Sequence, residues 1–146
     1  RRRPAHVRYT GDTKVMRIKH CLQLDDALRM MAAAKEEAIR NQWAVSISIV
    51  DDGGSVVALE RLDGANVQSP EIATLKAKTA ALSGKATREL EAMVKERPVM
   101  TSFPGRLMVT GGLPIYHASE CVGGIGVSGV KSHEDEQVAA AGLQAL

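Results

Sequence analysis

A glycine-rich segment near the carboxyl end places the strongest constraint on how this chain can fold. Residues 121–129 read CVGGIGVSG, in which Gly124, Gly126 and Gly129 have the G-x-G-x-x-G spacing of a dinucleotide-binding turn. That turn requires a following helix, a further parallel strand and an acidic residue about 20 positions later. Only 17 residues follow Gly129, which is enough for one helix and no strand. We therefore do not expect a Rossmann fold.

The density of glycines in this region needs a different explanation. Seven of the 13 glycines lie between Gly105 and Gly129. Glycine weakens a strand unless another group must approach its backbone closely. We therefore expect a hairpin of the sheet against which a ligand, another backbone segment or a helix packs.

Hydrophobic periodicity predicts helices and strands that follow a polar arm at residues 1–20. Four helices are expected, at residues 25–41, 70–82, 87–95 and 132–146. Four strands are expected, at residues 43–50, 56–62, 107–110 and 122–130. The Asp-Gly turn at 51–54 predicts an antiparallel hairpin, because glycine accepts the positive φ of such a turn. We therefore expect one domain over 21–146 of the α/β (α+β) class, with an antiparallel sheet flanked by helices.

Composition argues against nucleic-acid and membrane partners. Aromatic residues make up 3% of the chain, too few for base stacking, and the formal charge is only +2. No apolar run approaches the roughly 20 residues that span a bilayer. Two cysteines, Cys21 and Cys121, are too few for a disulfide framework, which favours reduced thiols and a cytoplasmic location. The chain begins with Arg1, so a removed leader stays open as an alternative.

The chain resembles the GlcG/HbpS family in five motifs that follow one another in order. These are VDDGGSVVALERLDGA from residue 50, IATLKAKTAAL from 72, GGLPI from 111, CVGGIGVSG from 121 and DEQVAAAGL from 135. The family includes small haem-binding proteins and the C-terminal domain of PduO-type corrinoid adenosyltransferases. The resemblance implies a profilin-like fold with a mainly antiparallel five-stranded sheet. It also implies homo-oligomers, from dimers to octamers, and a haem or tetrapyrrole pocket.

Two histidines are candidate ligands of the haem iron that the resemblance implies. His117 follows GGLPIY in an expected loop, where an imidazole can ligate iron or act as an acid or base near neutral pH. The alternative for His117 is a solvated loop histidine. His20 lies between the arm and the first helix, and the iron-ligating histidines of the family come from early in the chain. Tyr116 is a candidate for stacking on a planar ligand.

Two cations match family motifs and are candidate anion ligands. Lys76 matches the lysine of the KAxTA motif and can bind a propionate or another carboxylate. Its alternative is an ion pair, for instance with an acidic residue of 60–63. Arg61 matches the family's R-x-D-G-A, and its alternative is a structural role in a turn.

The remaining polar candidates are backbone amides and a helix terminus. Gly111 and Gly112 can cradle an anion with their amides, or they can form a plain turn. Asp135 is expected to act at the start of the last helix, as a cap or, together with Glu134 and Glu136, through the helix dipole. The alternative for these three carboxylates is a metal site.

These observations leave two functions open. The first is a haem- or tetrapyrrole-binding protein with a role in binding, storage, sensing or degradation, with haem preferred to a corrinoid. The second is an enzyme or accessory protein of small organic-acid catabolism that binds a carboxylate in the same pocket, with His117 as acid or base. In either case we expect a homo-oligomer in which Val138, Leu143 and Leu146 of the last helix meet their copies at a two-fold interface.

Overall fold

A computed structural model of the chain describes residues 16–146, so most of the arm expected over 1–20 lies outside the described residues. The helices of this part are α1 (Leu24–Arg40), α2 (Ser69–Ser83), α3 (Thr87–Glu96), the 3-10 helix η1 (Pro98–Ser102) and α4 (Ser132–Leu143). Its strands are β1 (Ser46–Asp51), β2 (Val56–Arg61), β3 (Gly112–His117) and β4 (Glu120–Ser128). No helix within residues 16–146 is both long and apolar enough to cross a membrane.

The strands form one antiparallel sheet in the order β2-β1-β4-β3. The predicted hairpin at 51–54 is confirmed and joins β1 to β2. In the central pair, Asp51 at the end of β1 lies opposite Gly123, close to the start of β4. Because of this register, the β1–β2 turn and the β3–β4 turn lie at the same end of the sheet.

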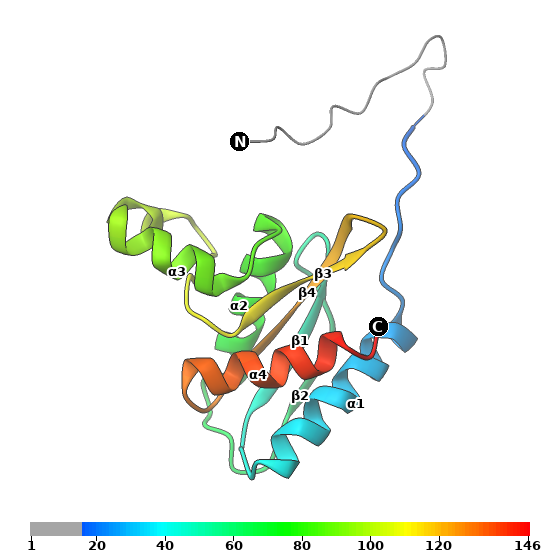
Figure 1. Cartoon of the computed structure of the whole chain (residues 1–146), viewed down its shortest axis with the longest axis vertical. Coiled ribbons are helices and arrows are strands. Elements are labelled where there is room, and N and C mark those ends of the chain that lie inside the picture. Colours follow the sequence, from blue (N-terminus) through cyan, green and yellow to red (C-terminus); the bar gives the residue numbers. More distant parts are fainter. Residues whose placement is uncertain (1–15) are drawn as a thin grey trace.

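Helices cover both faces of the sheet, with α1 and α4 on one side and α2 on the other (Figure 1). Ile47 and Ile49 of β1 are buried in the core shared with α1 and α4. On the opposite face, Ser48 accepts a hydrogen bond of 2.9 Å from Thr74 of α2. Val138 of α4 is fully buried in the same core as Ile47 and Ile49, so it cannot belong to the expected interface patch. Leu146 is 45% exposed.

The glycines of β4 allow α2 to lie directly on the sheet. A Cβ on Gly124 would lie 2.2 Å from the carbonyl oxygen of Ala77, and a Cβ on Gly126 would lie 2.1 Å from that of Ala73. Both distances are far below van der Waals contact, and both partners are backbone atoms. Of the three explanations for the glycine density, the close approach of a helix accounts for these two positions.

Residues 107–110 form no strand, contrary to the prediction. Their backbone amides bond to side chains of neighbouring helices instead of to a strand. The amide of Leu107 donates to Thr79 Oγ1 at 2.8 Å, and the amide of Thr110 donates to Glu91 Oε2 at 2.7 Å. This segment therefore lies against α2 and α3 rather than in the sheet.

Strands β3 and β2 form the two edges of the sheet, and β3 contains Gly112, which was expected in a turn. Pro114 has no amide hydrogen and pairs with Gly124 of β4, which is tolerated at the edge of a sheet. With β3 in place, residues 16–146 contain four strands rather than the five implied by the resemblance. The α+β class with an antiparallel sheet is confirmed.

Candidate functional site

A cavity of about 500 Å³ lies at the end of the sheet where both hairpin turns are found. Its walls come from the chain before α1, the first turns of α1, the β3–β4 hairpin and the C-terminal residue. The lining residues are His20, Cys21, Leu22, Asp26, Arg29, Tyr116, His117, Ala118, Val122 and Leu146. The volume falls within the range of roughly 300–1,000 Å³ that is typical of small-molecule sites.

The two histidines that the sequence offered as alternative ligands lie side by side in this cavity. The ring centroids of His20 and His117 are 4.7 Å apart, and the rings meet edge to face at 71°. Within residues 16–146, no group of three or more His, Cys, Asp or Glu side chains is arranged to hold a metal ion.

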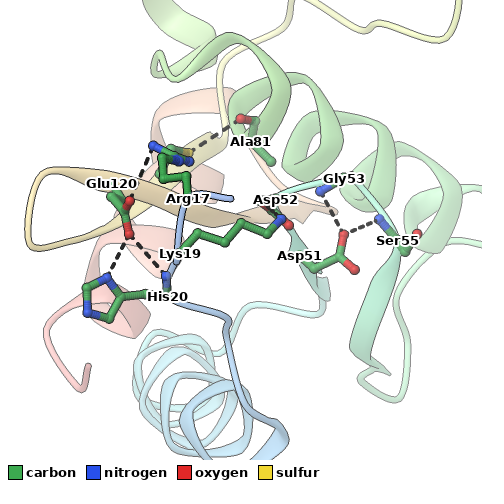
Figure 2. Close-up of polar contacts among 10 residues, drawn as sticks. Arg17, Lys19, His20, Asp51, Asp52, Gly53, Ser55, Ala81 and Glu120 are labelled. Atoms are coloured by element: carbon green, nitrogen blue, oxygen red, sulfur yellow. Dashed lines mark hydrogen bonds and ion pairs between the residues drawn. The ribbon is translucent and has the colours of Figure 1, made fainter. Parts of the chain in front are cut away.

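His20 is held by Glu120, the first residue of β4 (Figure 2). Glu120 Oε2 lies 2.7 Å from His20 Nδ1 and accepts a second hydrogen bond of 3.1 Å from the His20 backbone amide. A carboxylate acceptor assigns the ring proton to Nδ1, which leaves the lone pair of a neutral ring on Nε2. In Figure 2 the second ring nitrogen of His20 lies on the side away from Glu120. The bonds from His20 hold the pKa of Glu120 below its usual range.

The N-terminal segment (residues 16–23) bridges the two hairpin turns. Arg17 lies 3.4 Å from the second oxygen of Glu120, and Lys19 Nζ donates to Asp52 of the β1–β2 turn at 2.5 Å. Figure 2 shows Arg17 beside Glu120 and the side chain of Lys19 extending to Asp52. Each is an exposed ion pair that alone contributes little free energy, so several contacts together hold the segment in place.

A tight turn places His117 and Glu120 directly opposite each other on β3 and β4. Its central residues, Ala118 and Ser119, have φ values of 47° and 67°. A two-residue hairpin loop with both φ values positive favours Asn and Gly, so Ala and Ser here are strained. This strain lies between the two residues that contact His20.

Tyr116 and Arg29 also line the cavity. The hydroxyl of Tyr116 donates to the Gly84 carbonyl oxygen at 2.7 Å, which fixes the ring, and burial raises the pKa of the phenol. Arg29 bonds to Asp26 at 2.5 Å and remains largely exposed. The cavity thus offers a positive charge at one wall and apolar surface at another, from Leu22 and Leu146 among others.

Lys76 lies elsewhere, in a buried ion pair. Its Nζ donates to Asp135 Oδ2 at 2.9 Å and to the carbonyl oxygen of Val127 at 3.0 Å, and the side chains of Lys76 and Asp135 are each 3% exposed. Burial raises the pKa of Asp135, although Lys76 and the Val130 amide favour its ionised form. The partner is Asp135, not Glu60 or Asp63 as the sequence suggested, and this ammonium group is not among the groups that line the cavity.

The other anion candidates also bond within the protein. Arg61 donates twice to the carbonyl oxygen of Ala65, at 2.7 and 3.1 Å, and so closes its own turn. The amide of Gly112 donates to Thr87 Oγ1 at 2.9 Å. Gly111, at φ 126°, accepts a hydrogen bond from the Val127 amide rather than opening toward a ligand.

The structure thus brings together His20, His117 and Tyr116 and separates them from Lys76, Arg61, Gly111 and Gly112. Sequence reasoning missed Arg29 and Glu120. The signal for Glu120 was that two residues separate it from His117. A two-residue hairpin loop places its flanking residues opposite each other, but this applies only once 112–117 is known to be a strand.

Comparisons with known proteins agree with this architecture. Residues 22–144 match the family model for the haem degrading protein HbpS-like. Protein GlcG of Escherichia coli K12 is 37% identical over 114 residues, which cover 77% of this chain and 85% of GlcG. The crystal structure of a double mutant of Streptomyces reticuli HbpS superposes with a TM-score of 0.87 at 34% identity and covers 98% of this chain and 99% of HbpS.

A further solved structure is a complex of PduOC with heme. It has a TM-score of 0.80 and 28% identity, and the match covers 87% of this chain and 96% of PduOC. The family match spans nearly all of the described residues, from Leu22 before α1 to Gln144 after α4. The chain therefore belongs to the HbpS-like family.

Proposed function

We propose that this protein binds haem in the cavity between the N-terminal segment and the β3–β4 hairpin, with His20 as a ligand of the iron. The observation that carries this proposal is the hydrogen bond from His20 Nδ1 to Glu120. Histidines that bind metals almost always donate their other ring N–H to a carboxylate, a carbonyl or water. His20 already has this arrangement, with Nε2 as the ligand atom.

The rest of the cavity suits a planar, largely apolar group with acidic substituents. Leu22, Val122 and Leu146 supply apolar wall. Arg29 can pair with a propionate by charge-assisted hydrogen bonds. Haem, when bound, would supply a redox-active iron, while these residues bind and orient it. The haem in the PduOC structure supports haem as the group that this cavity binds.

The test is a titration of the purified protein with hemin, followed by absorbance in the Soret region. We expect a shifted Soret band for the wild type and for His133→Ala, a control that removes an exposed histidine of α4. His20→Ala should weaken binding at least about tenfold, because an axial ligand is lost. Identical spectra for hemin alone and for hemin with excess protein would refute haem binding. Equal affinities for His20→Ala and His133→Ala would refute only the choice of ligand.

His117 is the second candidate at the same site. Its ring contacts that of His20 from the end of β3, so it can replace His20 as the ligand or act as an acid or base beside the bound group. His117→Ala in the same titration separates these roles. A ligand role predicts a changed Soret position, and an acid–base role predicts an unchanged one.

The alternative function, binding of a small carboxylate, has less support. It relied on Lys76, Arg61 and the amides of Gly111 and Gly112, and three of these four residues donate to acceptors within the protein. Arg29 is an exposed cation of the cavity that could bind an acid, although it also pairs with Asp26. A thermal-shift screen of organic acids tests this function, because a true ligand raises the melting temperature by mass action.

We also propose that the protein forms a closed homo-oligomer. Val99 of η1 and the nearby Phe103 are 66% and 56% exposed, which leaves apolar surface uncovered beside α3. With Val138 buried, this surface replaces the last helix as the favoured contact between copies. A closed assembly pairs the same patch on two subunits around a two-fold axis.

A further inference from the structure

We infer that Glu120 is a positioning residue of the site, which selects the tautomer of His20 and holds the N-terminal segment on the β3–β4 hairpin. This inference rests on the haem-binding function proposed above. It assigns to Glu120 a role in setting the affinity and the reduction potential of the bound iron. Glu120 itself does not touch the haem in this scheme and acts only through His20.

The contacts of Glu120 carry the inference. One oxygen, Oε2, accepts both from the backbone amide of His20 and from its ring. The amide bond fixes where the backbone of His20 lies, and the ring bond fixes how the imidazole is turned. The other oxygen lies near Arg17, so both oxygens face the same segment. The Glu120 side chain is 26% exposed, against 56% for His20.

The two partners differ in how firmly the fold holds them. Glu120 begins a nine-residue strand that is buried along most of its length and is paired on both sides. His20 belongs to a segment without helix or strand, all of which is exposed apart from Leu22. Besides Glu120, the segment is held by Asp52, through Lys19, and by Leu22, which packs against the core. The strand therefore positions the histidine, and not the reverse.

A carboxylate behind a histidine ligand also changes the iron. It orients the ring and raises the basicity of the ligating nitrogen, and loss of such a partner typically lowers metal affinity by about 10- to 100-fold. A more basic ligand stabilises the ferric state, so removal of the charge should raise the reduction potential of the bound iron. A residue with only a structural role in the segment would not move this potential.

The variants separate these effects. Glu120→Gln keeps the shape and an acceptor oxygen but removes the charge, whereas Glu120→Ala removes both. Asp52→Asn weakens another anchor of the segment without touching His20. Glu36→Gln is the matched control, because Glu36 is an exposed glutamate of α1 that pairs with Arg40 of the same helix.

The first readout needs no haem. Long-range ¹H–¹⁵N correlation spectra of the ligand-free protein report which ring nitrogen of His20 carries the proton. We expect the Nδ1–H tautomer in the wild type, in Asp52→Asn and in Glu36→Gln. In Glu120→Ala we expect the Nε2–H tautomer that free histidine prefers, with an unchanged circular dichroism spectrum as evidence of folding.

The second readout is hemin affinity together with the reduction potential. Glu120→Gln and Glu120→Ala should lose about 10- to 100-fold in affinity and shift to higher potential. Asp52→Asn should leave the potential at the wild-type value. A Glu120→Ala protein that keeps the Nδ1–H tautomer, or that matches the wild type in affinity and potential, overturns the inference. If the wild type itself binds no hemin, the proposed function fails first, and the role of Glu120 falls with it.

Discussion

The buried pair of Lys76 and Asp135 allows a prediction that separates folding from ligand binding. In Lys76→Met, the carboxylate of Asp135 loses its cation, and the carbonyl oxygen of Val127 loses a donor. Both groups lie where water does not reach, since the two side chains of the pair are each 3% exposed. Removing one partner of a buried pair costs about 3–5 kcal/mol in unfolding free energy. For a domain of this size, that corresponds to a fall of roughly 6–20 °C in melting temperature.

Urea unfolding followed by the fluorescence of Trp43 measures this loss, because Trp43 packs against the main core. The hemin affinity of the folded variant should equal that of the wild type, since Lys76 is not among the residues that line the cavity. The double variant Lys76→Met/Asp135→Leu should recover much of the stability, because it leaves no uncompensated buried charge. A Lys76→Met protein with wild-type stability but reduced hemin affinity would refute the reasoning and restore Lys76 as a ligand residue.

Three further predictions concern the sheet, the loop before β3 and the assembly. Gly126→Ala should lower the unfolding free energy by about 1–3 kcal/mol, because the added methyl meets the backbone of α2 and not a mobile side chain; unchanged urea unfolding would contradict the close packing. The bonds from Thr110 hold the pKa of Glu91 below its ordinary value of about 4.5. The stability advantage over Glu91→Gln should therefore be constant at neutral pH and shrink as the pH falls through that lowered pKa; a constant difference down to pH 3 would exclude this linkage. Light scattering after size exclusion should give a mass above that of a single chain, and a monomer at micromolar concentration would rule out the proposed assembly.

Local signals in the sequence were sufficient to predict most of the helices and strands. Helix α2 was expected to begin at Pro70 and begins at Ser69, because proline at a first helical position marks a helix start in the sequence itself. The hairpin at 51–54 was found for the same reason, since its Asp-Gly turn requires no knowledge of distant residues.

The strand β3 could not be found in this way. Gly112 and Pro114 are turn residues on any local scale. Their extended conformation comes from pairing with Gly126 and Gly124 of β4 and from contact with α2. Neither contact is encoded near residue 112. Because β3 was missed, Glu120 was also missed at the site, since it becomes the partner of His117 only when both flank a hairpin turn.

The contacts that decide the roles of the candidate residues are also distant in sequence. His20 and Glu120 are separated by 100 residues, and Lys76 and Asp135 by 59. The motifs place Lys76 and Asp135 in separate helices, and nothing in either motif indicates that the two side chains meet. For Lys76, the sequence therefore supports a ligand and an ion pair equally, and only burial distinguishes them.

The placement of these two pairs separates a buried part of the molecule that sets stability from a rim that we propose binds the ligand. Lys76 and Asp135 join α2, β4 and α4 across the interior, so changes there act on the unfolding free energy. His20 and Glu120 meet at the rim of the sheet through exposed contacts, which contribute little to stability. Changes at the rim should alter hemin affinity and reduction potential while the melting temperature stays constant. The glycine-rich sheet, packed directly against α2, supplies the rigid base that lets one carboxylate on a strand orient a histidine on an irregular segment.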